Sequence, residues 1–249
     1  MKRQDLSVVV TGGGSGLGAA VCVEFAGRGA SVVAADLSFK SPPLPNVAHI
    51  VADACSEHDM SSLFARVADS RGRIDVLVCC AGVAPAHRVL GKNGPHDLDA
   101  FRRVVEINLT GTFNAVRLAA ERMKNNEPDS DGQRGVIVMT ASVAAFEGQN
   151  GQAAYAASKG AVVAMTLPLA RELSRFGIRV CTIAPGIFET PMLLGMPQEV
   201  QDSLSAMVPF PQRFGKPAEY ALLCRHITEN TMLNGEVIRL DGAVRMAAK

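Results

Sequence analysis

The residues best suited to acid–base chemistry are a tyrosine and a lysine in the stretch AYAASKG. Tyr155 and Lys159 lie on one face of a predicted helix, because residues at i and i+4 are neighbours on a helix surface. A tyrosine can act as a base near neutrality only if its pKa falls from about 10 by about two to three units. That change corresponds to a free energy of roughly 3 to 4 kcal/mol. A lysine charge nearby can supply up to about 4 kcal/mol. The pair predicts proton transfer at a hydroxyl, although ordinary surface packing uses the same spacing.

Two other polar residues lie where they can assist this transfer. Ser142 follows an apolar run at residues 136–139, and ligands of open α/β sheets bind beyond the carboxyl ends of the strands. Its hydroxyl can position a substrate oxygen against Tyr155 and polarise it. Asn108 lies in an apolar helical stretch, where a buried amide is costly without partners. We expect Asn108 to hold a water or a backbone group in the proton path.

A glycine-rich sequence, TGGGSGLG at residues 11–18, predicts a phosphate-binding turn. It follows the first apolar run and opens a helical pattern, and Gly12, Gly16 and Gly18 are its candidate contact residues. Glycine lets the backbone approach a pyrophosphate closely, and a helix N-terminus offers free N–H groups and the positive end of a dipole. A tight corner between a strand and a helix can also use two glycines, so the place after the first strand is what favours phosphate binding.

Asp36 ends the second apolar run, at about the spacing expected for the residue that binds the ribose of a dinucleotide. A carboxylate there can accept hydrogen bonds from ribose hydroxyls, whereas it repels a 2′-phosphate in a partly desolvated site. The glycine turn contains no lysine or arginine, and Leu37 beside Asp36 is apolar. These features favour NAD over NADP. The alternative is that Asp36 is a surface turn residue.

Short apolar runs predict the elements that must hold these residues. A strand that is buried on both faces has no reason to alternate polar with apolar residues, so such runs indicate a parallel sheet with helices on both faces. We therefore expect a single-domain, Rossmann-type, doubly wound α/β fold over residues 1–249. Loops are expected at residues 40–46 and 124–135, and a first helix at residues 19–28. The expected parallel strands, about seven in number, are residues 6–10, 31–35, 48–51, 76–79, 136–139, 179–183 and 237–240.

The composition limits the class of protein and its surroundings. With 249 residues, 48% hydrophobic and 20% charged, the chain matches a soluble globular protein, and no apolar run approaches the eighteen or so residues that span a bilayer. A net charge of +1 gives no reason for autonomous nucleic-acid binding or for membrane attachment. Residues 1–6 have neither the apolar core of a secretion signal nor the Arg/Ser-rich pattern of a transit peptide, so we expect neither. We expect a cytoplasmic protein, or one of the mitochondrial matrix if the source is eukaryotic.

The six cysteines are expected to be free, buried thiols. They form no CxxC pair and have no metal-ligand spacing with histidine, so no metal site is predicted. Two of them are adjacent at the end of an apolar run, where small buried cysteines are common. The cysteines are Cys22, Cys55, Cys79, Cys80, Cys181 and Cys224.

Together these motifs resemble the short-chain dehydrogenase/reductase family, over essentially the whole chain. The family pattern is a TGxxxGxG turn, an Asn, a Ser and a Y-x-x-x-K, here residues 11–18, Asn108, Ser142, Tyr155 and Lys159. The segments NEPDSDGQRGVIVMTASVAAFEGQNGQAAYAASKG, VPFPQRFGKPAEYA and NGEVIRLDGAVRM resemble, more narrowly, members that act on 3-hydroxyacyl-CoA. This resemblance implies NAD-dependent interconversion of a secondary alcohol and a ketone, as in (S)-3-hydroxyacyl-CoA and 3-oxoacyl-CoA.

The resemblance also assigns roles to single residues. In oxidation, Ser142 would hold the substrate hydroxyl, Tyr155 would remove its proton, and Lys159 would lower the tyrosine pKa and bind the nicotinamide ribose. The family commonly has Asn-Asn-Ala-Gly at residues 79–82, where this chain has Cys-Cys-Ala-Gly. Gln149 is expected at the substrate. The residues expected along the cofactor are Ser15, Leu17, Asp36, Asp53, Ala54, Cys80, Gly82, Pro185, Phe188 and Thr190.

The substrate is the most open question at this level. Residues 187–214 are rich in Leu, Met, Phe and Pro, which predicts an apolar lid, with core packing or subunit contact as alternatives. No basic cluster marks a site for the phosphates of CoA, so that substrate rests on resemblance. The alternatives are a hydroxysteroid dehydrogenase and a 3-oxoacyl carrier-protein reductase, of which Asp36 disfavours the second. A scaffold subunit of a larger complex is the alternative outside enzymes. The resemblance implies a homotetramer.

Overall fold

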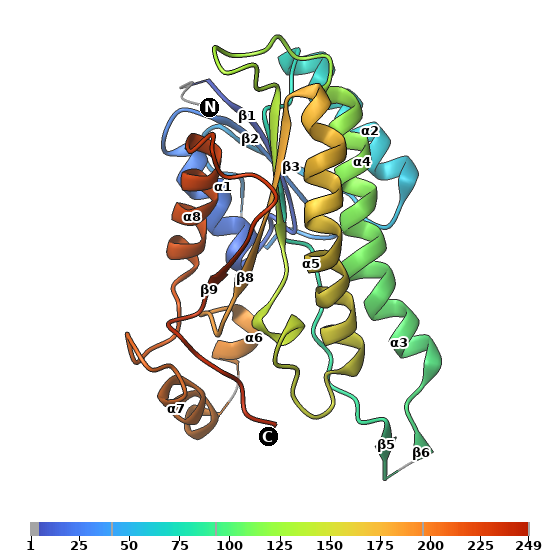
Figure 1. Ribbon diagram of the computed structural model, residues 1–249, viewed down its shortest axis with the longest axis vertical. Coiled ribbons are helices and arrows are strands. Elements are labelled where there is room, and N and C mark those ends of the chain that lie inside the picture. Colours follow the sequence, from blue (N-terminus) through green and yellow to red (C-terminus); the bar gives the residue numbers. More distant parts are fainter. Residues whose placement is uncertain (1–4, 41, 93, 196, 249) are drawn as a thin grey trace.

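A seven-stranded parallel sheet runs through the middle of the molecule (Figure 1). The computed structural model describes residues 5–40, 42–92, 94–195 and 197–248. The strand order is β3-β2-β1-β4-β7-β8-β9. Strands are therefore added on one side of β1 up to β3 and on the other side from β4 onward, and open sheets leave a crevice between β1 and β4, where this order reverses. All seven predicted strands are confirmed. They are β1 (Ser7–Thr11), β2 (Ser31–Asp36), β3 (Val47–Val51), β4 (Val76–Cys79), β7 (Gly135–Thr140), β8 (Ile178–Pro185) and β9 (Val237–Leu240).

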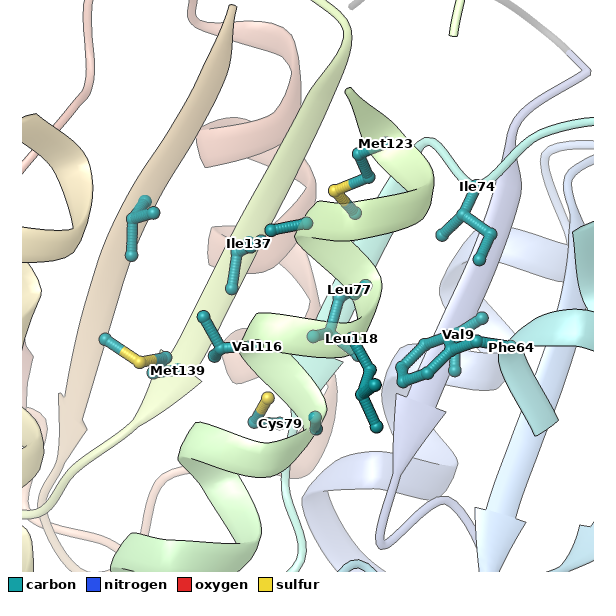
Figure 2. Close-up of a cluster of buried hydrophobic side chains, with 14 of the residues drawn as sticks. Val9, Phe64, Ile74, Leu77, Cys79, Val116, Leu118, Met123, Ile137 and Met139 are labelled. Carbon is teal, nitrogen blue, oxygen red and sulfur yellow. The ribbon is translucent and has the colours of Figure 1, made fainter. Parts of the chain in front are cut away.

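Helices cover both faces of this sheet, because alternate strand residues point to opposite sides and nearly all are apolar. Figure 1 shows α1 (Gly16–Ala26) and α8 (Pro217–Glu229) on one face, and α2 (Glu57–Arg71), α4 (Gly111–Met123) and α5 (Ala153–Leu173) on the other. Figure 2 shows the cluster of buried side chains on the face covered by α2, α4 and α5. In it, Leu77 and Ile137 of the sheet lie with Val116 and Met123 of α4. This packing fixes the carboxyl ends of the strands in one row.

The first helix differs slightly from its predicted limits. It begins at Gly16, three residues before the predicted start, and ends at Ala26 with Gly27 as its cap, rather than at residue 28. The early start matters, because it places the N–H groups of the first turn inside the glycine-rich sequence. The predicted loops at residues 40–46 and 124–135 contain no helix or strand in their described residues, apart from Gly135, which opens β7.

Four short elements were not among the predicted ones. A two-stranded hairpin, β5 (Leu90–Gly91) and β6 (Gly94–Pro95), precedes α3 (Leu98–Val105), and its residues are exposed. Two short helices, α6 (Pro191–Leu194) and α7 (Gln198–Ala206), lie within the predicted lid. Segments of two to nine residues are too short to show a helical or strand period, so periodicity gives no signal for them.

The helix Ala153–Phe176, which is α5 continued by a 3-10 turn, is the one helix among the described residues that is long and apolar enough to cross a membrane. That result concerns length and composition only. A third of its most apolar window is buried (33%), and the helix contacts β8 and the 3-10 turn after β7. Core helices that cover a sheet meet the same criterion, so it is weak evidence for a membrane span.

Candidate active site

A cavity of about 990 Å³ lies at the carboxyl ends of the strands, at the point where the strand order reverses. Ligands of doubly wound sheets bind at this place. All the predicted site residues except Asn108 line this cavity. They are Gly12, Ser15, Gly16, Leu17, Gly18, Asp36, Asp53, Ala54, Cys80, Gly82, Ser142, Gln149, Tyr155, Lys159, Pro185, Phe188 and Thr190.

The glycine turn forms a cradle that only glycine can make. Gly12 has a φ of 68°, and a Cβ there would lie 2.5 Å from the backbone nitrogen of Ala81. A Cβ on Gly18 would lie 2.1 Å from the carbonyl oxygen of Gly12. No acidic residue lies in the first turn of α1, and the side chain of Ser15 makes no capping hydrogen bond. The backbone N–H groups at this helix start therefore fit a pyrophosphate.

Asp36 is held rigidly at the edge of the cavity. Its Oδ2 accepts a hydrogen bond from the backbone N–H of Gly14 at 2.9 Å, and its Oδ1 accepts one from Leu37 at 2.7 Å. Each carboxylate oxygen retains capacity for another donor. Gly14 is required here, because a Cβ at that position would lie 2.9 Å from Asp36 Oδ2. The geometry fits a pair of ribose hydroxyls, and it ties the acidic residue directly to the glycine turn.

Asp53 and Ala54, which the family resemblance assigns to the adenine of the cofactor, follow β3. The backbone N–H of Asp53 donates to Asp59 Oδ2 at 3.0 Å, and Asp53 Oδ1 accepts from the backbone N–H of Cys55 at 2.9 Å. Asn114 of α4 donates to the carbonyl oxygen of Ala54 at 3.0 Å. The corner is therefore fixed from two helices, while Asp53 and Ala54 still face the cavity.

Tyr155 and Lys159 share one face of α5, as predicted. The ammonium nitrogen of Lys159 lies 6.0 Å from the centre of the Tyr155 ring and donates to the carbonyl oxygen of Thr140 at 2.8 Å. Burial lowers the pKa of Lys159 to about 8. Burial also raises the pKa of Tyr155, against a hydrogen bond with Ser142 that lowers it.

These directions correct one prediction, namely that Lys159 lowers the pKa of Tyr155. The net change in the pKa of Tyr155 is upward, and Lys159 is not among its causes. The physical reason is the burial of Tyr155 itself, which disfavours the charged phenolate. The residues of the chain therefore keep Tyr155 in its phenol form near neutrality.

Ser142 lies two residues beyond β7, and its side chain is the hydrogen-bond partner of Tyr155 in the cavity. It caps the 3-10 turn Val143–Ala145, with its hydroxyl oxygen accepting from the backbone N–H of Ala144 at 3.1 Å. This bond holds the hydroxyl in one rotamer while leaving its proton available. A serine fixed in this way can orient a substrate oxygen toward Tyr155.

Asn108 lies behind the cavity wall, in the π-helix Glu106–Thr110, and is fully buried. Its amide nitrogen donates to the carbonyl oxygen of Val83 at 2.9 Å and to Ser158 Oγ at 3.0 Å, while its Oδ1 accepts from the backbone N–H of Val83 at 2.8 Å. The predicted backbone partner of Asn108 is thus confirmed. A contact with water stays a prediction. Asn108 joins the loop after β4 to α5, and π-helical turns of this kind often occur at functional sites.

Ser158 extends this connection to the catalytic tyrosine candidate. Its hydroxyl donates to the carbonyl oxygen of Tyr155 at 2.7 Å while it accepts from Asn108. Sequence reasoning missed Ser158, although its position directly before Lys159 in the motif is a signal that could have been used. The backbone at the start of α5 is therefore fixed from the far side of the wall.

Thr140 and Tyr220 form a second fixed pair that sequence reasoning also missed. Tyr220 of α8 is fully buried, and its hydroxyl lies 2.6 Å from Thr140 Oγ1, which donates to the carbonyl oxygen of Cys79 at 2.5 Å. Burial raises the pKa of Tyr220 well above its ordinary value. The main-chain carbonyl of Thr140 is the acceptor for Lys159. Thr140 thus binds Lys159 and is itself held by Tyr220, from a helix far away in the sequence. No local motif signals these contacts.

The cysteines are all free, as predicted, but two of them are only partly buried, Cys55 and Cys80. Cys80 lines the cavity, and its Sγ lies 3.8 Å from the hydroxyl oxygen of Tyr220 and from Thr140 Oγ1. Burial raises the pKa of the Cys80 thiol. The thiol therefore stays protonated near neutrality and is a poor nucleophile.

The other end of the cavity is lined by apolar side chains. Leu193 of α6 and Leu204 of α7 face it, and Leu193 is buried. The ring of Phe188 packs against Gly215, where a Cβ would lie 2.6 Å from the ring. By contrast, Phe210 is 83% exposed. The predicted lid is thus a mixture of residues that close the cavity and residues that face outward.

Comparison with known proteins places this geometry among relatives. Residues 7–200 match the short chain dehydrogenase family. The chain is 54% identical to the 3-hydroxyacyl-CoA dehydrogenase type-2 of Drosophila melanogaster, over 96% of each chain. It is 53% identical to the protein of that name from Homo sapiens, over 98% of this chain and 96% of that one. The crystal structure of a 3-hydroxyacyl-CoA dehydrogenase type-2 from Mycobacterium avium, 36% identical, matches with a TM-score of 0.92 over 99% of this chain and 98% of that one.

Proposed function

This chain belongs to the short-chain dehydrogenase family and is an oxidoreductase that acts on CH–OH groups; from that premise we propose that it transfers hydride between NAD and carbon 3 of an (S)-3-hydroxyacyl-CoA. The observation that carries the proposal is the meeting of Ser142, Tyr155 and Lys159 in one cavity that Asp36 also lines. One end of this cavity suits a dinucleotide and the other an apolar chain. The named substrate comes from the relatives at 53% and 54% identity.

In oxidation, Ser142 donates a hydrogen bond to the substrate oxygen and orients it, and Tyr155 in its phenolate form removes the hydroxyl proton. The C–O bond gains double-bond character as the carbon loses hydride. When bound, NAD supplies the hydride acceptor for this step. In reduction Tyr155 donates its phenol proton to the ketone oxygen, and the raised pKa of Tyr155 suits this direction near neutrality.

Lys159 contributes a fixed positive charge and spare donors. One of its three N–H groups is used by Thr140, and two remain for hydroxyls of the nicotinamide ribose. When bound beside Tyr155, the positive ring of oxidised nicotinamide would favour the phenolate. We assign Asn108 a positioning role, since its amide hydrogens are both used to hold Val83 and Ser158.

The preference for NAD is assigned to Asp36. Its two oxygens are already oriented by the N–H groups of Gly14 and Leu37, so the carboxylate cannot easily turn away from a 2′-phosphate. Like-charge repulsion at that place selects against NADP. The remaining cofactor contacts are proposed for the glycine turn and the residues that line the cavity beside it.

A steady-state comparison tests the proposed function. We expect acetoacetyl-CoA with NADH to give the highest kcat/KM, above a β-ketoacyl carrier-protein analogue and a steroid ketone. We also expect NADH to exceed NADPH for each substrate. Highest activity with the carrier-protein analogue and NADPH would assign the chain to the reductase alternative instead.

The proposal includes a homotetramer, which is supported by apolar side chains on the outer faces of α4 and α5. Phe113 is 46% exposed and Leu167 is 44% exposed. Apolar surface on two neighbouring helices is typical of subunit contacts. Light scattering should give four times the 26.2 kDa mass of one chain, and a mass of 26.2 kDa would contradict this assembly.

A further inference from the structure

The segment that follows β9 turns back over the candidate active site. Gly242 and Ala243 both have positive φ angles, of 58° and 66°, and alanine rarely adopts this conformation. The side chain of Asp241 accepts from the backbone N–H of Ala243 at 3.0 Å, and the N–H of Val244 donates to the carbonyl oxygen of Asp241 at 3.1 Å. Val244 is fully buried. The turn is thus fixed from several sides.

Residues 245–248, here called the tail, lie along the loop at residues 146–152, which connects Ser142 and its 3-10 turn to α5. The N–H of Met246 donates to Glu147 Oε2 at 3.0 Å. Gln149 Nε2 donates to the carbonyl oxygen of Ala247 at 3.2 Å, and the N–H of Asn150 donates to that of Ala248 at 3.0 Å. Figure 1 shows this end of the chain, marked C, below the loop that precedes α5.

A network of four charged side chains holds the tail in place. Arg239 of β9 forms two bonds with Glu147, at 2.8 and 3.2 Å, and a third with Asp241 at 2.7 Å. Arg245 lies 3.3 Å from Glu147 and 3.3 Å from Asp241. The side chains of Glu147 and Asp241 are only 21% and 8% exposed. Bidentate and shared contacts of this kind hold geometry better than isolated surface pairs do.

The tail reaches the reaction cavity through Met246. This side chain lines the same cavity as Gln149, Gln152 and Tyr155, and the apolar Leu193 and Leu204 line it as well. Met246 is the one residue of the tail among the cavity-lining residues described. Its flexible thioether side chain fits against an alkyl group. An apolar side chain fixed in the wall of the cavity that holds Tyr155 limits the size of the group attached to the reacting carbon.

We infer that the tail is a fixed wall of the substrate pocket, held by Glu147, and that Met246 sets the length of alkyl chain the pocket accepts. The inference rests on the proposed function only in naming the alkyl chain as that of an acyl-CoA. It assigns Glu147 a positioning role and Met246 a role in specificity. Neither residue follows from the sequence motifs.

The test compares kcat/KM for substrates with four-carbon and twelve-carbon chains, with 3-oxoacyl-CoA thioesters in one series and simple methyl ketones in the other. Met246→Ala should raise the ratio of long-chain to short-chain kcat/KM about tenfold, as expected when a few methylene-sized groups leave a pocket wall. Met246→Leu, which conserves volume, should keep the ratio of the unsubstituted protein. Glu147→Gln should shift the ratio in the direction of Met246→Ala, by roughly two- to fivefold.

Glu24→Gln is the matched control. Glu24 also contacts two arginines, Arg28 and Arg225, and its side chain is 22% exposed, but it lies on α1 away from the tail. The ratio should not change in this variant. NAD binding by each variant, measured by fluorescence titration, shows that the cofactor end is intact.

Unchanged ratios in both Met246→Ala and Glu147→Gln, with NAD binding retained, would overturn the inference that the tail is a wall of the substrate pocket. The same holds if Glu24→Gln shifts the ratio as much as Glu147→Gln. If the thioesters are not turned over while the ketones are, the proposed acyl-CoA function fails. The ketone ratios then still decide the role of Met246.

Discussion

The wall of the cavity that carries Tyr155 differs from the rim formed by residues 187–214 in how its side chains are held. On the wall, Asn108 is fully buried and Lys159 is 5% exposed, and each donates a hydrogen bond to a backbone carbonyl of another part of the chain. On the rim, Leu194 is 56% exposed and Phe210 is 83% exposed. Groups that move protons are thus tied to the core, while part of the rim faces outward. Changes to the wall should affect stability and chemistry together, and changes to the exposed side chains of the rim should affect neither strongly.

The largest effect is expected at the centre of the wall. Tyr155→Phe removes the group that exchanges a proton with the substrate, so kcat should fall by about 10²- to 10⁴-fold, the usual contribution of general acid–base catalysis. NAD binding should change little, because the ring remains in place. Turnover assays and NADH fluorescence titration measure the two quantities separately. Turnover close to that of the unsubstituted protein would remove Tyr155 from the mechanism.

The second prediction sets the wall directly against the rim. Asn108→Ala leaves the half-buried N–H and C=O of Val83 without their partner and should lower the free energy of unfolding by roughly 2 to 3 kcal/mol. Phe210→Ser should stay within about 0.5 kcal/mol, because it changes an exposed side chain. Urea unfolding of both variants gives the comparison. Equal losses in the two would contradict the distinction between wall and rim.

A smaller effect is expected at the cofactor end of the wall. Asp36→Asn keeps the size of the side chain and removes its charge, so the ratio of kcat/KM with NAD to that with NADP should fall about tenfold. Gly14→Ala offers a second approach, since its Cβ would lie 2.9 Å from Asp36 Oδ2 and displace the carboxylate. An unchanged ratio in Asp36→Asn would show that another residue selects the cofactor.

The smallest expected effect is a pH dependence of kcat/KM that differs between oxidation and reduction. Burial raises the pKa of Tyr155, so phenolate is scarce near neutrality and kcat/KM for oxidation should rise with pH, by less than about tenfold per unit. The rise should flatten as Lys159 loses its proton near its pKa of about 8. Reduction uses the phenol and should not rise over this range. Rate profiles in both directions would detect an oxidation rate that falls with pH, which would contradict the raised pKa.

Strands and site residues could be predicted where one local pattern reports them. Strands buried on both faces give continuous apolar runs, and the spacing of Tyr155 and Lys159 places both on one helix face. The contact of Lys159 with the carbonyl of Thr140 could not be predicted, and neither could the contact of Thr140 with Tyr220, which forms only through the packing of β7 against α8. The prediction that the pKa of Tyr155 is lowered was wrong for a related reason. Spacing reports neighbours along a helix and does not report burial, which here has the larger effect.

The central claim is hydride transfer from carbon 3 of a hydroxyacyl-CoA to NAD at this site. It is tested most directly with (S)-3-hydroxybutyryl-CoA that carries deuterium at carbon 3, incubated with the purified protein and NAD. The account predicts that the NADH formed carries the deuterium, as seen by mass spectrometry, and that acetoacetyl-CoA appears in equal amount. Acetoacetyl-CoA formed without labelled NADH, or no reaction with NAD while NADP is reduced, would contradict it.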